Sequence, residues 1–211
     1  MDTTNARSWV VEIAQVVEEN KDYLTHLDSA IGDADHGVNL SRGFSQAAAL
    51  VTTTDYATPG ALLTAVGNTL ISKVGGASGP LYGTAFRKAG KAMGDTPEVD
   101  AAGLGRALEE ALTGVTTLGA SAVGDKTMVD ALDPAVAAYR AAVGSGASLA
   151  DAMADAAAAA DEGAKATIPL QALKGRASYL GPRSVGHQDP GATSTALLLG
   201  ALRDVLARPP A

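Results

Sequence analysis

The sequence predicts an all-α protein in which about eight antiparallel helices follow one another in an up-and-down bundle or barrel. Three observations support this prediction. Alanine, the strongest helix former, is very abundant, and Val and Thr do not gather in the alternating runs typical of strands. Apolar residues recur at helical spacing in successive segments. Most connections between these segments are short, which favours antiparallel neighbours.

The first five helices are predicted from apolar stripes and helix-start signals. The first is expected over residues 4–24, with its stripe at Trp9, Ile13, Val16 and Val17. The second is expected over residues 37–52. The third follows Thr58 and Pro59, an N-cap with proline at the first helical position, and runs to residue 74. The fourth is expected over residues 81–93, and the fifth lies between a loop at residues 94–100 and the loop that begins at Gly119.

The last three helices are predicted mainly from their first residues. Asp133 and Pro134 repeat the cap-and-proline signal, so the sixth helix is expected from there to Gly144. Ser148, with an aspartate three positions later, resembles a capping box and predicts a seventh helix that runs to residue 167. The eighth should begin at 189–190. Since 211 residues most often form one domain, we expect a single domain over residues 1–211.

An acidic stretch at residues 27–37 contains the clearest candidate site. It places Asp28, Asp33 and Asp35 within eight positions, together with two glycines. Clustered anions repel one another unless a cation lies among them, and carboxylate oxygens suit a hard divalent ion. Glycine permits the tight turn that would aim these side chains inward. We therefore expect a metal site. The alternative is a solvated acidic turn that caps the next helix.

The residues after Asp33 narrow the choice of metal. An EF-hand loop starting there would need Gly at position six and Glu at position twelve, but the sequence has Val38 and Phe44. Mg²⁺ usually takes one or two carboxylates together with phosphates of a substrate. We therefore expect Mg²⁺ that is completed by a phosphate ligand, and phosphate-binding elements elsewhere in the chain.

Two later connections have residues that suit phosphate, although each also has an ordinary structural explanation. The turn at residues 75–83 is Gly-rich and opens a helix, so its backbone N–H groups could bind phosphate. It matches neither a Walker A loop nor a dinucleotide fingerprint, and its small residues could simply allow close helix packing. The loop at residues 119–127 ends in Lys126 and Thr127, which fit a turn and a helix cap better than a phosphate contact.

The long connection at residues 174–190 carries Arg176, Arg183 and His187. A polar loop of this length is often a lid, and arginine can bond two phosphate oxygens at once. The alternative is a mobile surface loop. In up-and-down topology this loop, the two Gly-containing loops and the acidic stretch all follow odd-numbered helices. They should therefore meet at one end of the bundle.

Composition excludes several classes of function. The formal charge of −7 without a basic stripe argues against nucleic acid as a partner. The chain has no cysteine, hence no disulfide, which fits a reducing compartment. We find neither a signal-peptide pattern at the N-terminus nor an apolar run of about 18 residues that could span a membrane. We therefore expect a soluble cytoplasmic protein.

Five ordered motifs along the whole chain resemble those of the ADP-binding L subunits (DhaL) of dihydroxyacetone kinases. They lie at residues 27–37, 75–83, 124–128, 175–181 and 187–194. This resemblance implies an eight-helix antiparallel barrel with the nucleotide site at one end, where ADP or ATP is held through two Mg²⁺ ions. One departure is Ala34, where many relatives have glycine. A methyl group is tolerable there if the backbone stays in a common region.

The resemblance also implies a role for individual residues. Asp28, Asp33 and Asp35 would be the metal ligands. The phosphate side would be formed by His36, Gly37, Val38, Asn39, Ala77, Ser78 and Arg176. The adenine would be bordered by Gly119 and Met128, and the nucleotide would be covered by Asp189, Pro190 and Gly191. Arg176 is the expected catalytic residue, because it would neutralise a phosphoryl oxygen during transfer.

The implied activity is that of a phosphotransferase subunit which is active only with partners. A separate K subunit would hold dihydroxyacetone, and a histidine-phosphorylated carrier of the sugar phosphotransferase system would recharge bound ADP. Because the sequence ends without a K-like region, we favour this carrier-dependent form. The alternatives are a kinase subunit that uses free ATP and a nucleotide-sensing regulatory module. A third alternative is a metal phosphohydrolase, for which His36 is the only nearby candidate base.

Overall fold

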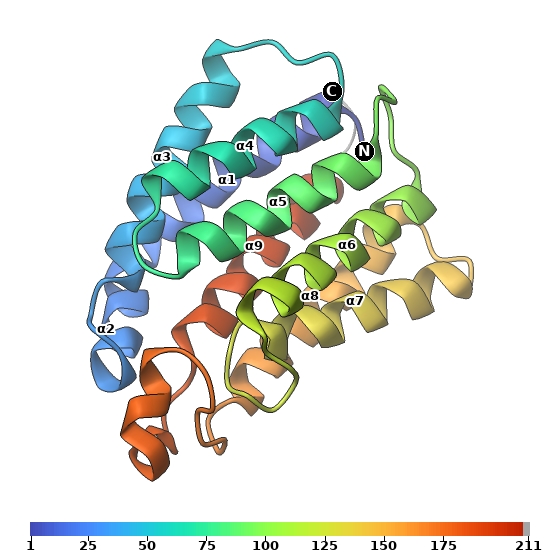
Figure 1. Ribbon diagram of the computed structural model, residues 1–211. Helices are drawn as coiled ribbons and strands as arrows, with labels where there is room; N and C mark the ends of the chain where they lie inside the picture. The colour runs from blue at the N-terminus through green and yellow to red at the C-terminus, as the bar shows by residue number, and fades with distance from the viewer. Residues whose placement is uncertain (209–211) are drawn as a thin grey trace.

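The computed structural model describes residues 1–208, which are mostly helical (Figure 1). Within this range there are nine α-helices, one 3-10 helix (η1) and no strand apart from an isolated bridge between Asp2 and Glu98. The elements are α1 (Thr3–Glu19), α2 (Lys21–Ile31), α3 (His36–Thr53), α4 (Pro59–Lys73), α5 (Ser78–Met93), α6 (Ala101–Gly119), α7 (Val129–Gly144), α8 (Leu149–Ala166), η1 (Arg176–Ser184) and α9 (Pro190–Leu206). Among the described residues, no helix is both long and apolar enough to cross a membrane.

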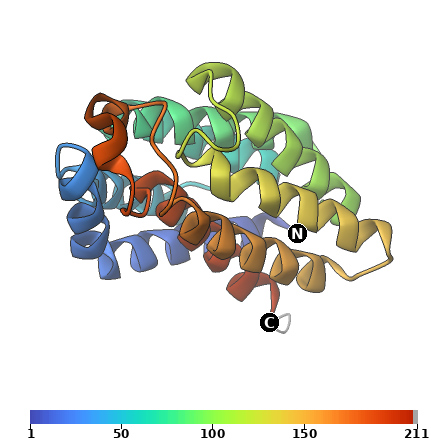
Figure 2. The ribbon, with the colours of Figure 1, turned by 90° about the horizontal axis from the view of Figure 1, so that it is seen from below.

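The eight long helices close into a barrel. Contacts run in order from α3 through α4, α5, α6, α7 and α8 to α9, and α1 closes the ring by packing against both α3 and α9. The helices lie side by side in Figure 1, and Figure 2 shows α2 and η1 together at one end. The predicted all-α up-and-down barrel is therefore confirmed.

Three of the predicted helix-start signals act as expected. Thr58 Oγ1 accepts a hydrogen bond from the N–H of Ala61 at 3.2 Å, and Ser148 Oγ accepts one from Asp151 at 3.1 Å. At the start of α9, Asp189 Oδ2 accepts the N–H of Ala192 at 2.7 Å. Each side chain satisfies a backbone donor that has no partner within its own helix.

The first expected helix is divided at Asn20, so the prediction of one helix over residues 4–24 was wrong. The Asn20 side-chain nitrogen donates to the carbonyl oxygen of Val16 at 2.8 Å, and α1 ends at Glu19. Side chains that bond nearby backbone groups offer the chain an alternative to the helical ladder. A second helix, α2, follows in a new direction and carries Asp28 in its last turn.

The helix α7 begins five residues before the predicted start, at Val129, and Pro134 lies inside it. Asp130 explains the early start. Its two carboxylate oxygens accept the N–H groups of Gly124 at 2.6 Å and Thr127 at 2.7 Å, which fixes the loop before the helix. Pro134 removes the donor that the Asp130 carbonyl would otherwise receive. α8 approaches this bare carbonyl closely, because a Cβ at Gly163 would lie 2.2 Å from its oxygen.

One large hydrophobic core fills the barrel. Near its middle Trp9 stacks on Phe86 with ring centroids 5.2 Å apart, and Phe44 meets Phe86 edge-on at 6.0 Å. The Trp9 indole N–H also donates to the carbonyl oxygen of Leu198 at 2.9 Å, so the polar end of this side chain is satisfied. This packing joins α1, α3, α5 and α9 and holds the helix ends that form the site.

Candidate functional site

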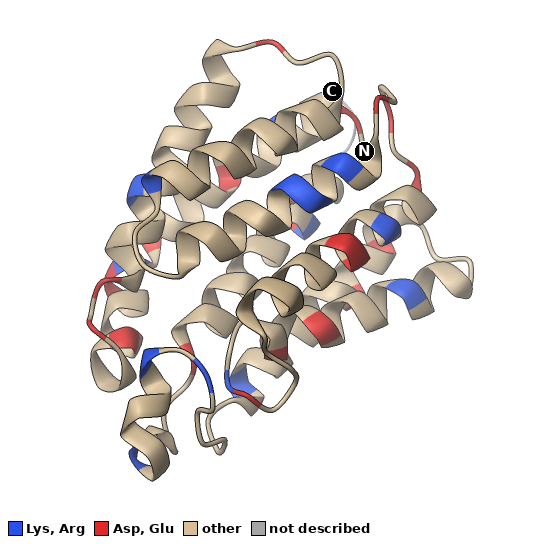
Figure 3. Ribbon diagram, in the orientation of Figure 1, with Lys and Arg blue, Asp and Glu red and all other residues tan. Residues whose placement is uncertain are grey.

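A cavity of about 290 Å³ opens at the end of the barrel that carries α2 and η1. Its lining includes Asp33 from the acidic stretch, Ser78 from the Gly-rich turn, Gly119 from the end of α6 and Arg176 from the long loop. The four connections that topology placed at one end therefore meet around one cavity. Acidic residues of the α2–α3 turn and basic residues near η1 lie on facing sides of this end (Figure 3).

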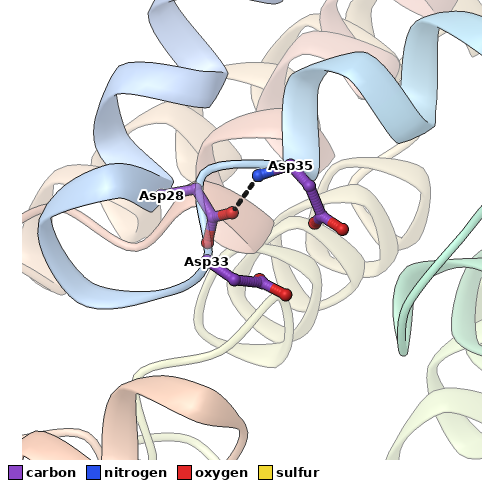
Figure 4. Close-up of side chains that lie close together, drawn as sticks. All are labelled: Asp28, Asp33 and Asp35. Carbon is purple, nitrogen blue, oxygen red and sulfur yellow. Dashed lines mark hydrogen bonds between the residues drawn. The ribbon is translucent and has the colours of Figure 1, made fainter.

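The three aspartates stand around the turn between α2 and α3 (Figure 4). Asp28 lies in the last turn of α2 and is buried. Its Oδ2 accepts the N–H groups of Asp35 at 2.9 Å and His36 at 3.2 Å. These are the free donors at the start of α3, so this carboxylate fixes the turn. The other Asp28 oxygen, the Asp35 side chain and, once its ion pair with Arg176 opens, the Asp33 side chain are available to a ligand.

The chemistry of this cluster fits a divalent cation. One oxygen from each aspartate can be chosen so that the three lie within 4.8 Å of one another. Three carboxylates this close repel one another, and oxygen is the donor that Mg²⁺ prefers. Gly32 makes room for the cluster, because a Cβ there would lie 1.9 Å from Asp28 Oδ1. These residues could therefore hold Mg²⁺.

Ala34, between two of these aspartates, has a left-handed backbone with a φ of 60°. The backbone is therefore outside the common region that we took as the condition for tolerating a methyl group at this position. For a residue with a Cβ the left-handed region costs about 1–2 kcal/mol, whereas glycine enters it freely. The turn that presents the carboxylates is thus strained at Ala34.

His36 is held from both sides by hydroxyl groups. Its Nδ1 lies 3.2 Å from Ser78 Oγ, and its Nε2 lies 2.9 Å from Ser194 Oγ. Burial lowers the pKa of His36, although the charges of Asp28 and Asp35 act in the opposite direction. With both ring nitrogens occupied and the ring buried, His36 presents no free nitrogen to a water in the cavity. This geometry counts against the phosphohydrolase alternative.

Arg176 is the first residue of η1 and reaches across to the acidic turn. Its Nε lies 2.9 Å from Asp33 Oδ2, and 68% of the Arg176 side chain is exposed. The guanidinium therefore stands at the mouth of the cavity, beside a predicted metal ligand. An exposed ion pair of this kind contributes little to stability, so Asp33 and Arg176 can both turn to a ligand.

Asp189 closes the opposite wall, where the long loop enters α9. Burial raises the pKa of its carboxyl group to about 7, and the nearby charge of Asp130 acts in the same direction. Backbone N–H bonds and the Lys126 ammonium act against this shift. Asp189 is thus a buried helix cap whose ionised form is destabilised by its burial.

Most of the predicted site residues line the cavity. They are Asp28, Asp33, Asp35, His36, Ala77, Ser78, Gly119, Met128, Arg176, Asp189, Pro190 and Gly191.

Three neighbouring predicted residues are outside the lining. Gly37 packs on α2, since a Cβ there would lie 2.0 Å from the Lys21 carbonyl oxygen. Val38 is 48% exposed. Asn39 accepts a hydrogen bond from the Arg42 guanidinium at 2.8 Å. Their assignment to the phosphate side stays a prediction.

The model of the DAK2 domain matches residues 30–204, which is most of the chain. The chain belongs to the DAK2 domain family. Its DAK2 domain carries both sides of the cavity, because the match runs from just before Asp33 to beyond Gly191. The family resemblance drawn from the five motifs is thereby confirmed.

The chain is similar to two bacterial kinase subunits, and each match covers nearly all of both chains. The chain is 44% identical over 197 residues to the ADP-binding subunit DhaL of PEP-dependent dihydroxyacetone kinase 1 from Listeria innocua, covering 93% of each chain. It is 40% identical over 202 residues to the corresponding ADP-binding subunit DhaL from Escherichia coli, covering 96% of each chain.

A solved structure shares the fold of this DAK2 domain. The dihydroxyacetone kinase of C. freundii in complex with AMP-PNP and Mg²⁺ superposes with a TM-score of 0.69 at 26% identity. The match covers 94% of this chain but only 33% of the C. freundii chain. The chain therefore spans about a third of that kinase.

Sequence reasoning missed a group of buried hydroxyls behind the cavity. The Tyr82 hydroxyl lies 2.7 Å from Ser194 Oγ and 2.9 Å from Thr195 Oγ1, and burial raises the pKa of Tyr82 to about 12. Through Ser194 this group reaches His36. The available signal was the polar run that begins α9, directly before its apolar stripe.

Proposed function

We propose that this chain is the ADP- and Mg²⁺-binding subunit of a dihydroxyacetone kinase, and that it works as a single helical domain. It would pass a phosphoryl group to dihydroxyacetone held on a separate K subunit. The observation that carries the proposal is the three-aspartate cluster facing Arg176 across one cavity, in a chain 44% identical to an ADP-binding subunit. A cytoplasmic location fits the absence of cysteine.

Each wall of the cavity has a different task in this proposal. Asp28, Asp33 and Asp35 would hold two Mg²⁺ ions, which when bound would neutralise charge on the phosphates. Arg176 would release Asp33 and bond a phosphoryl oxygen. Asp189, Pro190 and Gly191 would cover the nucleotide. Because His36 is tied by two hydroxyls, the base for the acceptor hydroxyl would have to come from the K subunit.

The phosphoryl donor can be identified by a coupled assay. We expect transfer when the chain is combined with a K subunit, dihydroxyacetone, phosphoenolpyruvate and the phosphotransferase carriers, with bound ADP acting as a cofactor. The two relatives named PEP-dependent support this form. Transfer with free ATP alone would favour the ATP-dependent alternative. Nucleotide binding without transfer in either assay would favour a sensing module.

Binding of ADP and Mg²⁺ should also change the thermal stability of this chain, and this can be measured without a partner subunit. ADP with Mg²⁺ should raise the melting temperature, and EDTA should reverse the change, because a ligand that binds only the folded state stabilises it. At about 100 times its dissociation constant the gain is about 2.7 kcal/mol, or roughly 5–10 °C for a chain of this size. Differential scanning fluorimetry on protein shown to be free of nucleotide and metal measures it. An unchanged melting temperature would contradict a preformed site.

A further inference from the structure

Lys126 is a lysine buried beneath the cavity, with 1% of its surface exposed and a left-handed φ of 61°. Its Nζ donates to the carbonyl oxygens of Thr167 at 2.7 Å, Leu170 at 3.1 Å and also His187. An ammonium group has three N–H donors, and these three oxygens, together with the carbonyl oxygen of Ile168 at 3.5 Å, take them. Lys126 therefore has no donor left for a phosphate, although it lies in the wall of the cavity.

The carbonyl partners of Lys126 belong to two segments that are far apart in the sequence. Thr167 and Leu170 directly follow α8, whereas His187 comes just before α9. Residues 171–186, which we call the lid, connect these two stems and include η1. Lys126 thus joins both stems of the lid to the α6–α7 loop. The partial negative charge at the end of α8 favours a cation at this place.

The position of Arg176 depends on the position of the lid stems. Inside the lid, Ala172 and Ala177 form a small apolar cluster with Ile31 of α2. Arg176 stands beside this cluster and reaches Asp33. The Leu173 N–H also donates to the carbonyl oxygen of Asp125 in the α6–α7 loop at 3.0 Å. Because these contacts are few for a segment of this length, the stems help to hold the lid. Two more hydrogen bonds close the base of the lid. The Gly186 N–H donates to the Ile168 carbonyl oxygen at 2.8 Å, and the Asp189 N–H donates to Thr167 Oγ1 at 2.9 Å.

We propose that Lys126 is a positioning residue that fixes both stems of the lid and thereby keeps Arg176 opposite the aspartate cluster. It acts through Arg176 and does not touch the phosphoryl group. The part of the inference that concerns transfer rests on the proposed function. The part that concerns the lid rests only on the contacts of Lys126 and is tested separately.

The first test measures opening of the lid by its cleavage with chymotrypsin at Tyr179, which is 87% exposed. Lys126→Met keeps an unbranched apolar stem in place of the four methylenes of lysine but removes the ammonium. We expect cleavage about tenfold faster or more, because bonds to a charged donor are lost from both stems. The matched control is Lys165→Met on the last turn of α8, an exposed lysine paired with Asp161 and Glu162. It should cleave at the wild-type rate.

Cleavage sites elsewhere decide whether the effect is specific. Faster cleavage at Tyr179 alone supports the proposal, whereas equal acceleration throughout the chain would show that Lys126 stabilises the whole barrel. Unchanged cleavage at Tyr179 would overturn the proposal directly. If Lys126→Met does not fold, Lys126→Gln takes its place, because its amide can still donate to two carbonyls. Failure of both variants to fold would also overturn a role limited to the lid.

The second test is a double-mutant cycle on the transfer rate with Lys126→Met and Arg176→Gln. If Lys126 acts through Arg176, Lys126→Met should slow transfer about tenfold in the wild type but less than about twofold in Arg176→Gln. If Lys126→Met slowed transfer by the same factor in the wild type and in Arg176→Gln, the proposal would be contradicted. If wild-type protein neither binds ADP nor supports transfer, the proposed function fails, whereas the cleavage result still decides whether Lys126 holds the lid.

Discussion

On one side of the cavity the carboxylates stand at the ends of two helices, whereas on the other side Arg176 stands on a 3-10 helix inside a long loop. Asp28 is buried and accepts two backbone N–H groups, so the acidic turn is fixed by bonds within itself. Arg176 is 68% exposed and has one ionic partner, Asp33. The lid that carries it is held by its stems, by the Leu173–Asp125 hydrogen bond and by the small cluster on Ile31.

This difference suggests a division of work between the acidic turn and the lid. A rigid group of carboxylates suits binding, because a ligand then finds its donors already in place. An arginine on a separate loop can change partners, from Asp33 to a phosphoryl oxygen, when charge develops during transfer. We therefore expect changes in the acidic turn to remove binding and changes in the lid to slow transfer. The predictions below test this division.

The largest effect is expected from Asp33→Asn and Asp35→Asn, each of which should lose Mg²⁺ and therefore ADP. An amide cannot offset the charge of the cation. Mutation of residues that only orient metal ligands typically lowers metal affinity about 10–100-fold. Loss of a ligand itself should therefore lower the affinity for Mg²⁺ at least about 100-fold. Calorimetry with ADP and Mg²⁺ measures the affinity. Asp22→Asn, an exposed aspartate on α2, is the control and should bind normally. ADP affinity within a few-fold of wild type in both variants would remove the cluster from the site.

The next effect is expected from Arg176→Lys, which should keep most of the ADP affinity but slow transfer roughly 10–100-fold. Lysine keeps the charge but not the fork that holds two oxygens in one plane, and arginines at this point of other transfer enzymes contribute about 10³-fold or more. Affinity and coupled rate should be measured on one preparation. The control is Arg183→Lys, another exposed arginine of the lid. A parallel fall in affinity and rate would mean that Arg176 serves ground-state binding.

A smaller effect is expected from Asp189→Asn, at the point where the lid joins α9, and it should depend on pH. In the folded protein the pKa of Asp189 is about 7, whereas the ordinary value is 3.8. The unfolded chain therefore loses this proton first, and stability falls as the pH rises from about 4 to about 7. Asparagine removes that cost and still caps the helix.

The quantity to measure for Asp189→Asn is its melting temperature relative to wild type, without nucleotide and metal. This difference should grow in favour of the variant between pH 4 and pH 7, to roughly 10 °C, and stay level above pH 7. Measuring the difference cancels the titration of other groups. A difference that does not change with pH would show that the Asp189 carboxyl is not destabilised by burial.

The smallest effect is expected from Ala34→Gly in the acidic turn, which should stabilise the protein by roughly 0.5–1 kcal/mol. Relief of the left-handed strain should exceed the entropy that glycine adds to the unfolded chain. Urea denaturation measures the change. Ala49→Gly, at an exposed position in α3, is the control and should destabilise by about 1 kcal/mol. Destabilisation by Ala34→Gly as well would show that this turn is not strained.

The sequence by itself determined the barrel and the end at which its site lies. Caps such as Thr58, Ser148 and Asp189 mark helix starts through bonds within a few residues, so they can be recognised without the fold. The four site loops follow every second helix of the predicted up-and-down bundle, so they must lie at the same end. The break at Asn20 and the early start of α7 were not predicted, because a short polar side chain can bond its own backbone or point outward with equal ease.

Only the tertiary structure decided what individual site residues contact. Lys126 meets carbonyls 41 to 61 positions away along the chain, and His36 meets Ser194 across 158 positions. The left-handed backbone of Ala34 lies in a turn whose two sides are joined by the bond from the Asp35 N–H to Asp28. Some residues of these motifs reach the cavity, others such as Gly37 pack against a neighbouring helix, and Lys126 supports the lid. Which of these occurs depends on partners from distant segments. Those partners meet only when the barrel closes.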